Sequence, residues 1–410
     1  MLADTDAGNV VAAAQAGAQW GYRLLPLLIV LIPMLYMVQE LTVRLGIFTG
    51  RGYGELIRER FGPAWAGLAA AGLAVATISS LITEFTGVAG IGELYGLSRA
   101  VTLPMAAAAL LAIVLTGSYR RVERIAIFIG LFELAFFVVA WTARPDPSAM
   151  VADSLSLPLH DREFLYLAAA IVGAVFNPWM VFYQQSAVVD KKLQPEHYGS
   201  ARWDTACGAV LTQLLTAAVL VAAAATIGNR AGIPGDASGP GKALTSVGEI
   251  SQALVALLGR SVGRLVFSMG VLGASLVAAI VSSLALAWGL GEMAGYKRSL
   301  EFSPFKAPWF YGPYGACLAG CAALVWLVPD LVSLTIAAQV VNAFLLPLVV
   351  GLLVALAVTA LPEGRRLRGW YLWAVLTVCA AACLLGLSGG ISGLTEPIGR
   401  LVFGSGPSGV

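Results

Sequence analysis

Histidine is scarce in this sequence, and its scarcity excludes several kinds of active site. His160 and His197 are the only two among 410 residues, and both lie beside charged residues in stretches that we expect to be loops. Intramembrane hydrolysis by a Ser/His pair or an HExxH zinc site therefore has no candidate residues. The 46 glycines make GxG patterns expected by chance, and none opens a strand-turn-helix unit. We expect neither an enzyme nor a bound cofactor.

Charge is also scarce, which excludes a soluble protein. Charged residues make up 12% of the chain and hydrophobic residues 59%, with a mean hydropathy of +0.83. Runs without any charge, such as 63–83, 205–228 and 265–291, are long enough to cross a bilayer as helices. The net charge of +2 gives no reason to expect nucleic acid. The composition predicts an all-α membrane protein in a lipid bilayer, with no obligate protein partner evident.

Hydropathy, interrupted by glycine, proline and charge, predicts about eleven spans in one transmembrane domain over 1–410. We place them at about 1–20, 24–46, 63–92, 101–118, 124–142, 165–189, 203–228, 262–290, 309–328, 331–361 and 369–388. Spans one to five and six to ten have opposite orientations. This predicts a five-plus-five inverted repeat, at about 1–142 and 165–361, with an extra helix at 369–388. The stretch 229–245, rich in Gly, Pro and Ser, is expected to be a flexible loop.

The basic residues predict how the chain sits in the membrane. Of the 25 lysine and arginine residues, 16 cluster after even-numbered spans: Arg44, Arg51, Arg58, Arg60, Arg120, Arg121, Arg124, Lys191, Lys192, Arg202, Lys297, Arg298, Lys306, Arg365, Arg366 and Arg368. Because basic connections stay on the cytoplasmic side, we expect a cytoplasmic N-terminus and an external C-terminus in the plasma membrane.

Two spans are interrupted by polar residues. The stretch 171–185, IVGAVFNPWMVFYQQ, contains Asn177 and Pro178. Proline has no backbone N–H, so the carbonyl of Ala174 loses its helical partner and is free to bind a cation. A kink satisfied by a neighbouring helix is the plainer alternative. The first span has a second interruption at Asp6-Ala7-Gly8-Asn9, and paired interruptions of this kind indicate a transporter site.

The start of the first span is short. Met1 stands only five residues before Asp6, so the half-helix expected ahead of the interruption is nearly missing. We expect either a misassigned start codon or a trimmed chain.

The spans contain other polar residues that are candidates for function, because ionisable groups in a bilayer tend to mark transport pathways. We expect Glu40 to pair with Arg44 at helical spacing, and Glu292 to be solvated or paired near the cytoplasmic end. Glu84 and Glu133 stay open. Gln339 is an isolated amide for which an interhelical hydrogen bond is the simplest explanation.

These residues resemble a known family, the NRAMP divalent-metal transporters. Asp6-Ala7-Gly8-Asn9 followed by VVAAAQAGAQWGYRLL resembles the DPGN-(x)-QAG-(x)-GY opening of that family, and GAVFNPWM resembles its GA-x-x-MPH motif in helix six. LGIFTG at 45–50, Ser80 to Gly87 with Glu84, and Gln339-Val340-Val341 with Leu346-Pro347 are similar to its helices two, three and ten. The resemblance implies a LeuT-like fold with helices one and six broken. It also implies a divalent metal held by Asp6, Asn9 and the carbonyl of Ala174, with Gln339 joining when the site closes.

The departures from the family pattern bear on the ion. Asn177, a hard oxygen donor, stands where the family has a methionine, so Asp6, Asn9 and Asn177 make an oxygen-only site that suits magnesium. Trp179 and Gln184 replace the two helix-six histidines, and an interior without histidine makes proton coupling doubtful. The pattern resembles the NRAMP-related magnesium transporters.

We therefore expect Mg²⁺ uptake by alternating access without proton coupling. The alternatives are a proton-coupled Mn²⁺/Fe²⁺ importer in which Glu84 carries the proton, a non-transporting metal sensor or receptor, and a sodium-coupled amino-acid carrier of the same architecture. A sodium-coupled amino-acid carrier binds the carboxylate of its substrate at this place, and the negative charge of Asp6 would repel that carboxylate.

Overall fold

The computed structural model describes residues 5–115, 119–227, 244, 246–255, 260–295, 308–328 and 330–403, and within these it contains helices and no strands. The longer helices are α1 (Ala7–Trp20), α2 (Leu25–Thr49), α4 (Pro63–Leu94), α5 (Arg99–Leu115), α6 (Tyr119–Gly130), α7 (Ala135–Thr142), α9 (Arg162–Val175), α10 (Pro178–Asp190), α11 (Tyr198–Thr226), α13 (Arg260–Ala294), α14 (Pro308–Leu327), α15 (Leu331–Thr359) and α16 (Gly369–Phe403). Shorter ones are α3 (Tyr53–Phe61), α8 (Pro147–Leu155) and α12 (Val247–Val255), with 3₁₀ turns η2 (Leu131–Leu134), η3 (Pro195–His197) and η5 (Glu363–Arg365).

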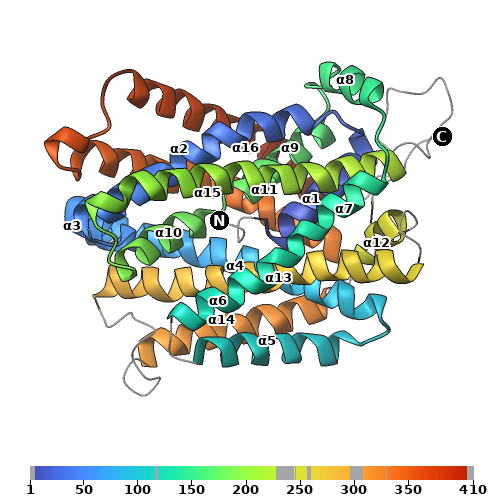
Figure 1. Ribbon diagram of the computed structural model, residues 1–410, viewed down its shortest axis with the longest axis horizontal. Coiled ribbons are helices and arrows are strands. Elements are labelled where there is room, and N and C mark those ends of the chain that lie inside the picture. Colours follow the sequence, from blue (N-terminus) through green and yellow to red (C-terminus); the bar gives the residue numbers. More distant parts are fainter. Residues whose placement is uncertain are drawn as a thin grey trace.

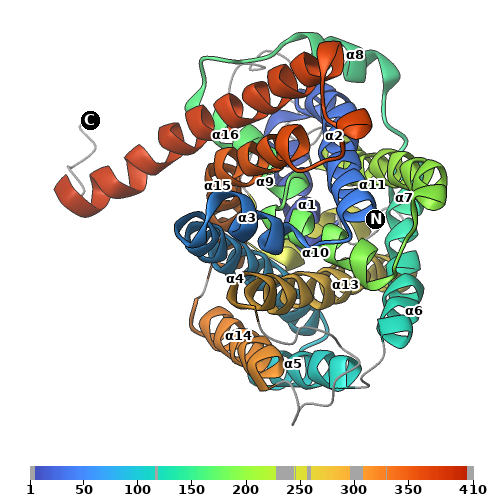
Figure 2. The same cartoon turned by 90° about the vertical axis from the view of Figure 1, so that its left-hand side faces the viewer.

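Eight helical segments of the described chain are long and apolar enough to cross a membrane, and α5 and 311–327 are shorter apolar helices. Together with α1, they occupy the places of the expected spans. α5 and α14 lie together at one edge of the bundle, whereas α1, α9 and α10 lie inside it (Figures 1 and 2). The most apolar stretch of 162–190 is 89% buried, against 22% for 121–142, so the interrupted span is the centre of the bundle.

The break in the sixth span is confirmed. α9 begins after Asp161, whose side chain accepts hydrogen bonds from the N–H groups of Glu163 and Phe164, and it ends at Val175. Asn177 has φ −55° and ψ 118°, and Pro178 starts α10. Proline at the first position of a helix costs no hydrogen bond there, so Pro178 ends one half-helix and begins the other.

The interruption expected in the first span falls at the start of α1, directly after Asp6. This residue is extended, with φ −86° and ψ 172°, and its side chain caps α1 by accepting a hydrogen bond from the N–H of Asn9 at 2.6 Å. A half-helix before this break falls on residues 1–4, which lie outside the described residues. α1 packs against α9, α11 and α15, so both breaks lie in the middle of the molecule.

Three differences from the expected elements have simple causes. α3 and α8 lie in stretches that we took as connections, because helices of nine residues are too short to register as spans. The helix expected at 369–388 continues to Phe403. A glycine at its expected end does not stop the helix but allows close packing, because a Cβ atom at Gly389 would stand 2.1 Å from the carbonyl oxygen of Leu165. The expected loop at 229–245 lies outside the described residues, apart from Leu244.

The basic connections gather at one end of the bundle. The Arg44 guanidinium contacts the carbonyl oxygen of Arg365 at 3.5 Å, and the Gln185 amide donates to the carbonyl oxygen of Arg51 at 2.9 Å. Arg58 lies against Gly295, just past the end of α13. The connections after spans two, six, eight and ten therefore meet, and α3 and α10 mark this end in Figure 1. We call it the basic end.

Candidate metal site

The five residues singled out from the sequence lie together at the two helix breaks. Asp6, Asn9, Ala174, Asn177 and Gln339 are all at most 2% exposed. Asp6 and Asn9 come from the start of α1, Ala174 and Asn177 from the gap between α9 and α10, and Gln339 from α15. Three segments that are far apart in the sequence thus meet at one buried point.

Asp6 is the central acceptor. Its Oδ1 accepts hydrogen bonds from the backbone N–H of Asn9 at 2.6 Å and from Asn9 Nδ2 at 3.1 Å. Its Oδ2 accepts from Asn177 Nδ2 at 2.9 Å. The carboxylate thereby joins the two broken spans directly.

The carbonyl of Ala174 is the second acceptor, and it is the group that the proline was expected to free. Its oxygen accepts from Asn9 Nδ2 at 3.0 Å and from Asn177 Nδ2 at 2.7 Å. Residue 178 has no N–H to offer, so side-chain amides take the place of the missing helical bond. The same two amides therefore bridge Asp6 and Ala174.

Gln339 reaches the cluster because α15 approaches both breaks closely. A side chain at Gly8 would stand 1.6 Å from Gln339 Nε2, and one at Gly173 would stand 1.9 Å from the backbone oxygen of residue 339. Only glycine leaves this room. Asn342, one turn along α15, donates from Nδ2 to Asn177 Oδ1 at 2.8 Å and to Gln339 Oε1 at 3.0 Å.

Asn342 is a residue that we missed in the sequence. It is completely buried and belongs to the cluster. Its spacing of three from Gln339 puts both amides on one face of a helix, and this is the signal that could have identified it.

The cluster can change from a hydrogen-bonded form to an oxygen cage. The Nδ2 groups of Asn9 and Asn177 point at Asp6 and at the Ala174 carbonyl, where a cation would be attracted. Terminal amide torsions are soft and nearly two-fold, so a half-turn of each amide exchanges its N–H₂ group for its oxygen. Two carboxylate oxygens, one backbone carbonyl and the amide oxygens would then converge, a donor set that suits Mg²⁺, Ca²⁺ or Mn²⁺.

The comparisons with known proteins agree with this architecture. The family profile described as "Natural resistance-associated macrophage protein-like" matches residues 1–392. The chain belongs to the Nramp family. It is 28% identical over 309 residues to the "Divalent metal cation transporter MntH" of Yersinia pestis, covering 72% of this chain and 71% of that protein. The protein of the same name from Verminephrobacter eiseniae is 27% identical over 396 residues, covering 93% and 85%.

The solved structures show the fold of this Nramp protein. A manganese transporter of Eremococcus coleocola superposes with a TM-score of 0.73 at 17% identity, covering 99% of this chain and 86% of that one. The expected all-α, LeuT-like fold is thereby confirmed. The five-plus-five inverted repeat stays a prediction.

Of the remaining buried carboxylates of this Nramp chain, Glu84 lies beside the site. Glu84 is 1% exposed, and its Oε2 accepts from the N–H of Ala7, next to Asp6, at 3.2 Å. Glu40 forms the expected ion pair with Arg44 at 2.9 Å and accepts from the hydroxyl of Tyr198. Glu133 is fully buried in η2, where the fifth span departs from α-helix.

A cavity of about 370 Å³ runs along α10 from the break to the basic end. Trp179 and Met180, which directly follow the break, line it together with Gln39, whose amide donates to the sulfur of Met180 at 3.0 Å. Lys191 at the end of α10 pairs with Glu123 and lines the same cavity. The cavity thus reaches from the residues that follow the break to the end of α10.

For Glu292, the sequence left a solvated or a paired carboxylate open. It is 4% exposed, so the solvated alternative is excluded. Its carboxylate accepts from the N–H of Gly54 at 2.9 Å and from the hydroxyl of Ser186 at 2.6 Å, which ties α13 to α3 and α10. Gly54 and Ser186 are uncharged, so the sequence offers no pairing of opposite charges that would have predicted these two contacts.

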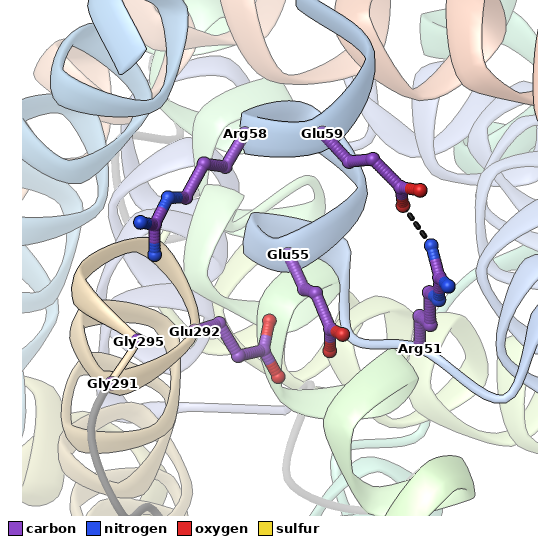
Figure 3. A pocket seen from close by; sticks show the side chains of 7 residues that line it. All are labelled: Arg51, Glu55, Arg58, Glu59, Gly291, Glu292 and Gly295. Atoms are coloured by element: carbon purple, nitrogen blue, oxygen red, sulfur yellow. Dashed lines mark hydrogen bonds and ion pairs between the residues drawn. The ribbon is translucent and has the colours of Figure 1, made fainter. Parts of the chain in front are cut away.

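A pocket of about 570 Å³ lies beside Glu292 at the basic end. Glu55 from α3 and Glu292 from α13 point into it, and Arg51 pairs with Glu59 at its edge (Figure 3). The hydrogen bond from Arg51 holds the pKa of the Glu59 carboxyl below its usual range. Both members of this pair are exposed, so the pair contributes little to stability.

Proposed function

We propose that this chain imports a divalent metal ion by alternating access, and that Asp6, Asn9, Ala174 and Asn177 bind the ion, with Gln339 joining when the site closes. The observation that carries the proposal is the meeting of the freed Ala174 carbonyl with the Asp6 carboxylate and the amides of Asn9 and Asn177. The Asp6 carboxylate and the Ala174 carbonyl face one point, and half-turns of the Asn9 and Asn177 amides would bring their oxygens to it. The names of the relatives, all transporters, leave the sensor alternative without support.

For the ion, the comparisons support manganese better than the magnesium that we expected from the sequence. The curated relatives are named as divalent metal cation transporters, and the structural neighbour is a manganese transporter. Carboxylate, carbonyl and water ligands suit Mn²⁺ as well as Mg²⁺, so manganese does not need a thioether here. Mn²⁺, with Fe²⁺ as a second substrate, is therefore our first candidate.

Mg²⁺ uptake is the second candidate, and one observation favours it. None of the five ligands that we propose carries sulfur, and Asn177 supplies an amide where the family pattern has methionine. Mg²⁺ binds through one or two carboxylates and keeps several waters, which fits a site with Asp6 as its one carboxylate.

The manganese candidate includes proton coupling, with Glu84 as the carrier. The hydrogen bond from Ala7 to Glu84 places this buried carboxylate next to the break that holds Asp6, so the protonation of one can respond to the occupancy of the other. In the magnesium candidate, which has no proton coupling, Glu84 has only a structural role: it accepts the hydrogen bond from the N–H of Ala7.

Uptake into proteoliposomes that contain a pH dye tests the ion and the coupling together. We expect Mn²⁺ to enter and to outcompete Mg²⁺, with acidification of the lumen that is lost in Glu84→Gln. A matched control is Glu93→Gln, an exposed carboxylate on the same helix that pairs with Arg99. Entry of Mg²⁺ without acidification would instead select the second candidate.

We further propose that the basic end faces the cytoplasm, which puts the N-terminus inside and the C-terminus outside. The gathering of basic connections at one end supports this orientation, because such connections are retained on the cytoplasmic side.

A further inference from the structure

Asn342 occupies a position between two of the ligands that we propose. Its Nδ2 donates to Asn177 Oδ1 at 2.8 Å and to Gln339 Oε1 at 3.0 Å. All three side chains are at most 1% exposed. A single amide thus fixes which way two others point.

The arrangement leaves two buried atoms of this trio without a hydrogen-bond partner in the described part of the chain. They are Asn342 Oδ1 and Gln339 Nε2. A buried polar atom that is left unsatisfied costs about 1–3 kcal/mol. The present arrangement therefore carries a cost, and a ligand that satisfies one of these positions would favour a second arrangement of the same amides.

Half-turns of all three amides give that second arrangement. Asn342 Oδ1 would accept from both Asn177 Nδ2 and Gln339 Nε2. Asn342 Nδ2 and Gln339 Oε1 would give up their present hydrogen bond, which leaves the Gln339 oxygen free to bind a cation. The oxygen of Asn177 would turn to the side where Nδ2 now contacts Asp6. The oxygen of Gln339 would turn to the side where Nε2 now lies over Gly8. Both oxygens would then face the carboxylate.

We propose that Asn342 is a positioning residue that makes the amides of Asn177 and Gln339 turn together, so that a cation recruits both oxygens or neither. The inference rests on the proposed function, because it takes the cluster as the ion site. In the first arrangement, the N–H₂ groups occupy the coordination positions and the cluster is neutral apart from Asp6. A divalent ion pulls oxygens inward, and the hydrogen bonds to Asn342 transmit that turn from one ligand to the other.

Equilibrium binding of Mn²⁺ and of Mg²⁺ to the purified full-length chain in detergent tests this role without requiring transport. Asn342→Leu keeps the size and removes both polar groups. We expect it to weaken binding of the ion that the parent binds by about tenfold, equivalent to one hydrogen bond of about 1.4 kcal/mol. Thr335→Val is the control, since Thr335 is a buried residue of α15 whose hydroxyl bonds to the carbonyl of Leu331 on its own helix. We expect that variant to bind like the parent.

A second variant separates positioning from packing. Asn342→Asp offers acceptor atoms alone, which favours the arrangement in which Asn177 and Gln339 both donate to residue 342. We expect it to bind at least as tightly as the parent. Binding as weak as in Asn342→Leu would overturn the inference.

Coupling between the proposed ligand Gln339 and the positioning residue Asn342 is the decisive readout. In a double-mutant cycle of Gln339→Leu and Asn342→Leu, we expect the double variant to bind no more weakly than the poorer single variant, because both changes break one linkage. Additive losses would overturn the inference, as would parent-like binding by Asn342→Leu. If the parent binds neither ion, the proposed function fails together with the inference; if the parent binds and the variants do not differ, the inference alone fails.

Discussion

Asp6 carries the negative charge of the candidate site, and this makes it the residue on which ion binding depends most. It is the one carboxylate among the six clustered residues, and it is fully buried. A divalent ion that faces only neutral oxygens in a low-dielectric interior lacks the attraction needed to offset its dehydration. We expect Asp6→Ala to abolish metal uptake into proteoliposomes while the folded protein is still recovered.

Asp146→Ala is the matched control for this change. Asp146 caps α8 in a connection, where hydrogen bonds from Ser148 lower the pKa of its carboxyl. Its loss should leave uptake intact. Near-parent uptake by a correctly inserted Asp6→Ala protein would place the ion elsewhere.

Asn177 tests the ligand type. Replacing its hard oxygen by the thioether of methionine should favour soft ions, because affinity follows the match in softness between ligand and metal. We expect Cd²⁺ to inhibit uptake of the transported ion at about tenfold lower concentration in Asn177→Met, as a gain of about 1.4 kcal/mol at one ligand implies. The ratio of the two affinities is the quantity to measure, since methionine also changes packing.

Met180→Leu provides the comparison for that experiment. Met180 lies in the cavity wall one turn beyond Asn177 and already presents a sulfur. If its sulfur takes no part in binding, the affinity ratio in Met180→Leu will equal that of the parent. An unchanged ratio in well-folded Asn177→Met would mean that residue 177 does not face the ion.

At this scale, the sequence singled out residues that conflict with their surroundings, and the structure brings them together. Asp6, Asn177 and the Ala174 carbonyl were identified because a carboxylate, a proline and a freed carbonyl are costly inside a bilayer. Asn342 and Ser186 were missed, since a single amide or hydroxyl in a span is common and its partners come from distant segments. Only the folded chain reveals those partners.

At the scale of elements, α10, the second half of the broken sixth span, is held by Glu292. Its carboxylate bonds to Ser186 on α10 and to the start of α3. Removing the hydroxyl leaves a buried charged acceptor with one partner fewer, which costs about 1–3 kcal/mol. We expect Ser186→Ala to lower the free energy of unfolding by that amount, measured by thermal or denaturant unfolding in detergent.

Ser282→Ala is the control for this prediction. Ser282 is a buried serine of α13 whose hydroxyl contacts the carbonyl of Ala279 on its own helix at 3.5 Å. The interhelical contact of Ser186 should therefore matter more than this local one. Equal stability of the two variants would show that Glu292 does not fasten α10.

The elements themselves were predictable to different degrees. The spans follow from long apolar runs, and the break in the sixth follows from Asn177-Pro178. α3 was not foreseen, because its nine residues mix charge with apolar side chains and its fixed position depends on Glu292 of a distant helix. Hydropathy identifies long apolar segments that are buried in the bilayer. It does not identify short helices whose position depends on tertiary contacts.

At the scale of the whole molecule, the sidedness of the membrane protein can be measured directly. In a Cys207→Ser background, cysteines at the exposed positions Ser148 and Glu196 report on connections at opposite ends. We expect a membrane-impermeant thiol reagent to label Ser148→Cys on intact cells, and Glu196→Cys only after the membrane is opened, because basic connections stay inside. The reverse pattern would invert the proposed orientation.

If the cluster binds the ion as proposed, its single carboxylate also sets how the transport cycle responds to voltage, apart from any proton that Glu84 carries. With an ion bound, the site carries about one net positive charge; with none, it carries about one net negative charge, and each elementary charge that crosses 100 mV is worth about 2.3 kcal/mol. An inside-negative potential therefore drives the loaded site inward and the empty site back outward. The membrane potential would therefore drive both the inward step of the loaded site and the outward return of the empty site. A site with a second ionised carboxylate would carry no net charge when loaded, so the potential would drive only the return of the empty site.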